Sequence, residues 1–328
     1  MKPTISPLKK QHAGIRFGFA AFVTYYDPNL DYRHAPLFVH DSTGSIFIGL
    51  PLRPILPLHP GTLIEVTGIS GAGDYAPVVL HGSVRILGNS RLPQNAARPT
   101  MAELLSGNLD GQWVEVAGIV HSVHLEGTEA TIELATVGGS ISANAPLEAN
   151  GNYDSLIDAA VQIRGNAVPI FNGNRQMVGA RILFPSLNSV NVVQQAPPDP
   201  YDMPAVPVRK LLWFSPGVVL RHRVHIRGRV TLNWPGRMLC IQESSDGVCM
   251  QSPRLDRVQI GQTVDVVGFP VIGEFKATLD NASFRVAEGN TALTAAPVSF
   301  QQAFSGNHDR ELVQIEGELI GGTVRPPT

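Results

Sequence analysis

The feature that most constrains this chain is an internal repeat. Four segments alternate apolar and polar residues around one small residue and continue into a second strand-like stretch: 17–24, 114–121, 224–231 and 313–320. The small residues are Ala21, Gly118, Gly228 and Gly317. They stand 97, 110 and 89 positions apart, so the repeating unit is a domain and not one turn of a solenoid.

Each of the first three units continues with the same strand signals. A hairpin pattern of period two surrounds a Ser/Thr/Gly/Asp turn at 36–48, 131–143 and 238–250. A fourth strand is predicted at 61–68, 159–165 and 261–268, and a fifth near 78–87, 177–184 and 277–286. Five strands with a glycine bend in the first are typical of a Greek-key barrel of the OB type. Glycine and proline supply 58 of 328 residues, which also favours an all-β chain rich in turns.

The segments between these units predict how the barrels are joined. Capping boxes at Thr100–Glu103 and Ser299–Gln302 predict short helices near 100–105 and 299–304, in equivalent positions before the next barrel. Prolines between 197 and 207 predict a stiff, extended linker into the third unit. We therefore expect tandem five-stranded OB-like barrels joined by short helices and Pro-rich linkers. The expected domains are 1–97, 98–196 with its leading helix, 197–292, and a truncated fourth unit at 293–328.

Charge and composition restrict the function. The formal net charge is −2, so no overall field attracts the chain to nucleic acid or to anionic lipid. No apolar run reaches the roughly 18 residues that a membrane helix needs, and the first ten residues lack the apolar core of a signal peptide. We expect this chain to be soluble as given, with any targeting segment of its parent absent from it.

Several stretches together resemble a known family. These are 22–27, 37–47, 110–116, 172–176 and 264–270. In order and spacing they resemble the N-terminal extracytoplasmic region of bacterial sensor histidine kinases, which consists of tandem OB-like domains ahead of a membrane span. The resemblance implies a periplasmic sensor, ligand-binding or scaffold region whose membrane helix and kinase domains follow residue 328. Ala21 departs from the glycine of the other units, and the chain carries no kinase motif.

The aligned hairpins yield the first candidate site. Their outward positions hold Phe38, His40 and Phe47 in the first unit, and smaller or polar residues in the others. Aromatic rings on this face of an OB barrel stack bases or sugar rings. The competing interpretation is that Phe38 and Phe47 pack against the neighbouring barrel.

A polar loop in the second unit is the second candidate. It contains Asn172, Asn174, Arg175 and Gln176, where Arg175 could clamp a carboxylate or phosphate; the alternative is a turn whose side chains cap its own backbone. The ten histidines do not combine into a metal site, since His222 and His225 would project to opposite faces of a strand. Hydrolase and phosphate-loop motifs are absent, so we expect no catalysis, metal or cofactor.

The sequence thus leaves three functions open. The favoured one is a non-catalytic sensor or scaffold whose partner is a small molecule, a glycan or a protein, together with downstream membrane-anchored kinase segments. A single-strand nucleic-acid or oligosaccharide binder is the second, although its basic residues are limited to a cluster at 209, 210, 221, 223, 227 and 229. An accessory domain of a secreted hydrolase is the third.

The two cysteines form the last expectation. Cys240 and Cys249 occupy the hairpin positions of Phe38 and Phe47, so they should face each other across the ladder. A disulfide between them and two free thiols packed against a neighbouring barrel both fit this arrangement.

Overall fold

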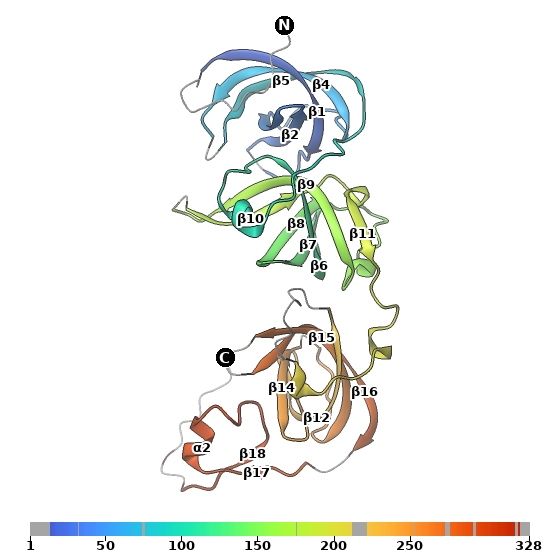
Figure 1. Cartoon of the computed structure of the whole chain (residues 1–328), viewed down its shortest axis with the longest axis vertical. Coiled ribbons are helices and arrows are strands. Elements are labelled where there is room, and N and C mark those ends of the chain that lie inside the picture. The colour runs from blue at the N-terminus through green and yellow to red at the C-terminus, as the bar shows by residue number, and fades with distance from the viewer. Residues whose placement is uncertain are drawn as a thin grey trace. The chain divides into compact units, whose positions relative to one another are not determined.

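The computed structural model describes residues 14–31, 33–73, 76–174, 176–211, 222–252, 254–272, 276–290, 293–318 and 321. Contacts divide the chain into two compact units, Met1–Ala196 and Pro197–Thr328, which are described separately. Strands dominate both units (Figure 1), which confirms the expected all-β fold. Among the described residues no helix has both the length and the apolar character needed to cross a membrane.

The first barrel is closed and has five strands. They are β1 (Arg16–Tyr26), β2 (Ala35–Asp41), β3 (Gly44–Leu50), β4 (Thr62–Gly71) and β5 (Val78–Asn89). Their order is β1-β2-β3-β5-β4, and β3 pairs with β5 in parallel while the other neighbours are antiparallel. This order and parallel closure are those of an OB-type Greek key.

The second barrel follows the same plan within the first unit and adds one strand. Its strands are β6 (Trp113–Glu126), β7 (Glu129–Thr136), β8 (Gly139–Pro146), β9 (Ala160–Phe171), β10 (Met177–Leu183) and β11 (Val190–Gln194). β10 pairs in parallel with β8 and antiparallel with β9, which closes the ring. The expectation of five strands missed β11. A proline and the 3-10 turn Leu187–Ser189 interrupt the last strand, and β11 then resumes along β9.

The third barrel lies in the second unit and is closed like the first. Its strands are β12 (Val224–Trp234), β13 (Met238–Glu243), β14 (Asp246–Gln251), β15 (Gln262–Ile272) and β16 (Ala277–Asn290). The order is β12-β13-β14-β16-β15, with β14 parallel to β16. Tandem OB-like barrels are therefore the architecture of this chain, while the four predicted domain boundaries stay a prediction.

Alternation along each hairpin fills the barrels as expected. The inward residues of all three hairpins are at most 5% exposed, and they belong to three separate apolar cores. They are Leu37, Val39, Ile46 and Ile48; Ile132, Leu134, Ile141 and Ala143; and Leu239, Ile241, Val248 and Met250. Period-two patterning thus sets the register, because a slip of one residue would turn each set outward.

The small residue of each of the first three repeats marks a bend in the first strand. The pairing register shifts just after Val23 in β1, Val120 in β6 and Val230 in β12, two positions beyond Ala21, Gly118 and Gly228. A Cβ added at Gly118 would lie 2.5 Å from the backbone oxygen of Ala135. The repeat therefore encodes a β-bulge that lets one strand serve both sides of the barrel.

Both predicted helices are confirmed, each with its capping box. α1 (Met101–Leu105) is capped by Thr100, and α2 (Phe300–Phe304) by Ser299. α1 and α2 start 199 positions apart, as do the parallel pairings of Ala97 with Val114 and of Ala296 with Val313. The fourth unit thus begins as the second does, although its strands β17 (Ala296–Pro297) and β18 (Val313–Gln314) have only two residues each.

The linker into the third barrel is less regular than predicted. It contains two 3-10 turns, Pro200–Asp202 and Val208–Lys210, and another such turn occurs in the second barrel at Asp154–Leu156. Asp199 accepts a hydrogen bond from the backbone N–H of Tyr201, which stabilises the first of these turns. The prolines of the linker therefore coexist with two 3-10 turns, the first of which is capped by Asp199.

Candidate functional site

The hairpin face of the first barrel is covered. Phe38 is 3% exposed and forms an apolar cluster with Tyr25, Phe47 and two residues of the second barrel, Leu183 and Val168. Phe38 points out of its own barrel and is buried by packing between barrels, which is the alternative to a stacking platform that the sequence left open. Phe47 is only half-buried, and its ring centroid lies 5.2 Å from that of Phe38.

The segment that enters the second barrel completes this cover. The side-chain amide of Gln112 accepts a hydrogen bond from the backbone N–H of Ser45 at 3.2 Å and donates one to its carbonyl at 3.1 Å. Asp110 accepts from the backbone N–H of Ala76, in the β4–β5 loop. Because OB barrels bind ligands with this hairpin face and this loop, the first barrel uses its usual ligand surface as a joint.

His40, the third predicted ligand residue, lies at the same joint. Its Nδ1 is 2.9 Å from the hydroxyl of Ser45, whose backbone Gln112 binds. Partial burial lowers the pKa of His40, although the nearby Asp41 carboxylate opposes this effect. His40 therefore supports the hairpin turn.

The third barrel repeats this joint with different side chains. The segment after α2 lies on its hairpin, where Gln242 accepts a hydrogen bond from the backbone N–H of Leu312 at 2.8 Å. Glu311, 199 positions beyond Gln112, forms an ion pair with Lys276 at 2.5 Å, and its other oxygen lies 2.9 Å from Nδ1 of His308. Lys276 lies just before β16, as Ala76 lies just before β5. Two hairpin faces are thus occupied in the same way.

The cysteines lie on the hairpin of the third barrel. Cys240 and Cys249 are direct partners in the β13–β14 ladder, which confirms the predicted facing arrangement. They form a disulfide with a Cα–Cα distance of 4.1 Å. Here a covalent pair takes the place of the two aromatic rings of the first barrel.

The polar loop of the second barrel is a self-capped turn. The side-chain oxygen of Asn172 accepts hydrogen bonds from the backbone N–H groups of Asn174 and Gln176, both at 3.0 Å, and its amide donates to the Gln176 side chain. This is the alternative that the sequence left open. Arg175 lies outside the described residues.

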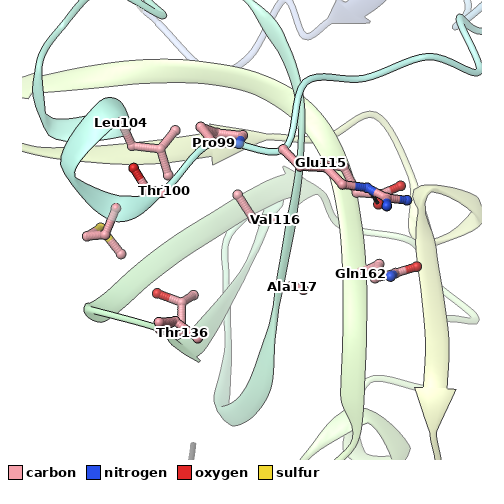
Figure 2. A pocket seen from close by; sticks show the side chains of 11 residues that line it. Pro99, Thr100, Leu104, Glu115, Val116, Ala117, Thr136 and Gln162 are labelled. Atoms are coloured by element: carbon pink, nitrogen blue, oxygen red, sulfur yellow. Dashed lines mark hydrogen bonds and ion pairs between the residues drawn. The ribbon is translucent and has the colours of Figure 1, made fainter. Parts of the chain in front are cut away.

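Two grooves on the second barrel are the remaining candidates. The first, of about 300 Å³, lies between α1, β6 and the β7–β8 turn. Figure 2 shows Leu104 and Thr100 on one side of this groove and Thr136 on the other, with Val116 between them. The second, of about 390 Å³, is lined by Trp113, Gln162, Arg164, Ser189 and Asn191, with the 92–94 segment and Asn188.

A buried carboxylate lies between these grooves. Glu115, whose side chain is 4% exposed, binds Nε of Arg98 and Nε of Arg164, each at 2.7 Å. Burial raises the pKa of Glu115, but hydrogen bonds and charge from Arg164 and Arg98 outweigh it and hold the pKa below its ordinary value. Two guanidinium groups thus share one carboxylate, which leaves one net positive charge on the trio, with Arg98 beside the first groove and Arg164 beside the second.

Sequence reasoning missed this trio as well as Gln112. Glu115 and Arg164 are opposite in the β6–β9 register, so alternation in the repeat could have placed them on one outward face. Among the described residues, no group of three His, Cys, Asp or Glu could hold a metal ion. His225 is buried, with Nδ1 2.7 Å from the carbonyl of Met203 and Nε2 3.1 Å from Asp265.

Comparisons with known proteins do not assign this chain to a family. No family model matches the chain, and no curated protein matches it. Solved structures that are similar in part include a murine DNA-binding protein bound to double-stranded DNA, with 12% identity over 53% of this chain and 96% of that one, at a TM-score of 0.28. An OBody bound to hen egg-white lysozyme has 17% identity over 31% of this chain and 100% of the OBody chain, with a TM-score of 0.25. Asparaginyl-tRNA synthetase from Pyrococcus horikoshii has 18% identity over 28% of this chain and 22% of the synthetase chain, with a TM-score of 0.23. At these values the similarities carry no argument about function.

Proposed function

We propose that this chain is a non-catalytic scaffold of tandem OB-like barrels, in which hairpin faces join one unit to the next. The observation that carries this proposal is the repeated joint. Gln112 binds the first hairpin, and the Glu311–Leu312 segment lies on the third, at positions related by the same 199-residue offset. In the first and third barrels the hairpin face is covered by the segment that enters the next unit. We infer that in these two barrels the face holds units together.

The setting of this scaffold is also part of the proposal. The disulfide between Cys240 and Cys249 fits an oxidising compartment, where such bonds persist. Our proposal is that the chain belongs to the extracytoplasmic part of a signalling protein, and the disulfide and the residue resemblance support it. The sensor-kinase parent rests on the resemblance alone.

The basic cluster gives little support to a nucleic-acid binder. Arg227 is bound to Asp265 through Nε at 2.7 Å and Nη2 at 3.1 Å, so its charge is largely compensated. Arg221 lies outside the described residues. Within this cluster, Arg227 thus forms an ion pair between β12 and β15.

Hydrogen exchange of the full chain tests the scaffold. A thymidine oligonucleotide or a mixed oligosaccharide, added at low ionic strength, is expected to leave amide exchange at 35–50 and 238–251 unchanged, because these hairpins are already covered. New protection at either hairpin would overturn the proposal. As an internal control, Phe38→Asp should speed exchange in that hairpin, since it places a charge in the packed cluster between two barrels.

A further inference from the structure

The second barrel and the third barrel each have an outward surface formed by the first and fourth strands of that barrel, and the two surfaces correspond residue by residue. Val114 pairs with Gly165 in the second barrel, as Val224 pairs with Gly268 in the third. In this alignment Glu115 corresponds to His225, and Gln162 corresponds to Asp265. The strand next to the fourth strand follows the same alignment. Asn191 on β11 lies opposite Gln162, and Arg285 on β16 lies opposite Asp265.

In the third barrel a tyrosine from the entering segment occupies this surface. The hydroxyl of Tyr201 is 3.0 Å from the hydroxyl of Ser283, and the guanidinium of Arg285 lies 4.4 Å from the centre of its ring. His225 meets the ring edge-on at 6.2 Å. The carboxylate of Asp199, two residues before the tyrosine, lies 3.7 Å from Arg285. We call the surface that receives Tyr201 the tyrosine seat.

In the second barrel the corresponding surface is the groove of about 390 Å³. Ser189 stands two residues before Asn191, as Ser283 stands two before Arg285, and both Ser189 and Asn191 line the groove. The entering segment differs at one decisive position. Tyr201 lies four residues before Ala205, which bridges to His225 on β12, whereas Ala97 bridges to Val114, the position before Glu115. In this register Gln94 takes the place of Tyr201. The side-chain amide of Gln94 is exposed and donates to the carbonyl of Leu92 at 3.2 Å, so it leaves the position of the phenol ring open.

The groove offers an arginine, a hydroxyl and an amide to a ligand, although Asn191 stands where Arg285 stacks on Tyr201 in the third barrel. Arg164 is held at its edge by Glu115, and its planar guanidinium suits stacking on an aromatic ring. Ser189 and Asn191 offer polar partners for a hydroxyl. Arg98 and Arg164 together carry one more charge than Glu115 neutralises. A carboxylate next to the tyrosine of a bound peptide could therefore pair with these arginines. The volume lies within the range of small-ligand sites.

From this correspondence we propose that the groove of the second barrel binds a tyrosine-bearing acidic peptide segment of a partner protein. The tyrosine ring lies against Arg164, its hydroxyl bonds Ser189 or Asn191, and the flanking carboxylate pairs with the arginines. The site adds a partner-binding role to the scaffold and does not depend on the hairpin joints.

A labelled peptide tests the proposal on the full chain. The probe is a fluorescein-labelled synthetic peptide with the sequence of residues 197–206, which contains Asp199 and Tyr201, and binding is followed by fluorescence anisotropy. Asn188→Trp fills the groove from an exposed position at its edge, and Asn174→Trp is the matched control on an exposed loop outside the groove. We expect the groove variant to weaken binding at least about tenfold and the control to leave it unchanged.

The peptide itself provides further arms. Replacing its tyrosine by alanine should abolish the anisotropy change, and replacing its aspartates by asparagine should weaken binding and reduce its salt dependence. Binding that is equal in Asn188→Trp and in the unmodified chain would overturn the proposal, as would no binding at all. Competition by N-acetyltyrosinamide at the same concentration as the peptide would overturn the peptide part, since the groove would then recognise only a phenol.

Discussion

Replacing Gln112 by alanine is expected to loosen the joint between the first two barrels. The substitution removes two hydrogen bonds to Ser45 and leaves the backbone N–H of a residue that is only 7% exposed without its partner. Each hydrogen bond contributes about 0.5–1.5 kcal/mol, and an unpaired buried group costs about 1–3 kcal/mol. We expect the free energy of local opening at Ser45 to fall by about 2 kcal/mol in total.

Native-state hydrogen exchange measures this change directly. A loss of about 2 kcal/mol corresponds to exchange of the Ser45 amide that is roughly 30-fold faster. Gln162→Ala is the matched control, because its side-chain hydrogen bond to Asn191 is exposed and its loss should change exchange little. The reasoning is refuted if Ser45 keeps its protection in Gln112→Ala, or if both variants speed its exchange equally.

Three further predictions concern the stability of single barrels. Gly118→Ala should lower the free energy of unfolding by about 1–3 kcal/mol, because its new Cβ meets a backbone oxygen at 2.5 Å. Gly228→Ala should lower it by less, because there the Cβ meets a movable side-chain carbon at 3.0 Å. Urea unfolding that ranks the two variants in reverse contradicts this. Hydrogen bonds from Arg227 lower the pKa of Asp265 from 3.8 to about 2, against the effect of desolvation. The ionised carboxylate is therefore the stabilised form, so up to about 2 kcal/mol of stability is present above pH 4 and is lost as the pH falls towards 2. Asp265→Asn should flatten that acid transition in thermal scans. Replacing both Cys240 and Cys249 by alanine should cost the third barrel about 2–3 kcal/mol through the short loop that the bond closes; no change on adding reductant to the unmodified chain would disprove it.

The alternation of the sequence was sufficient to predict which hairpin residues fill each barrel. Leu37 and Ile48 face inward because side chains on a strand alternate, and this relation involves only neighbours in the chain. Their outward neighbour Phe38 shows where the prediction stops. Its burial depends on Leu183 and Val168, about 130 to 145 positions away, and no periodicity within the hairpin encodes that contact.

The candidate sites were less predictable for the same reason. Gln112 looks like an ordinary polar residue until the fold brings it to Ser45, 67 positions earlier. The tyrosine seat became visible only after β-sheet register placed Gln94 of the second barrel where Tyr201 lies in the third. The facing arrangement of Cys240 and Cys249 was the exception, because their matched spacing with two aromatic residues placed them opposite each other in one ladder, while the bond between them stayed an open alternative.

The two joints differ in chemistry, and this difference predicts different responses to pH and salt. Gln112 joins the first hairpin through a neutral amide, whereas Glu311 at the corresponding position binds Lys276 and His308. Burial raises the pKa of Glu311, but hydrogen bonds and charge from Lys276 and His308 outweigh it and hold the pKa below its ordinary value.

Because the carboxylate form of Glu311 is the one stabilised, its contribution is complete at pH values above the ordinary glutamate range and is lost as the pH falls through it. The protection factor of the Leu312 amide, whose partner is Gln242, should therefore fall as the pH passes down through the glutamate range and should fall in high salt, while that of Ser45, held by the neutral Gln112, should change less over the same range. Glu311→Gln should remove this acid step from the protection of Leu312. If Leu312 keeps its acid sensitivity in that variant, the charge of Glu311 does not hold the third barrel's joint, and the two joints are alike in position only.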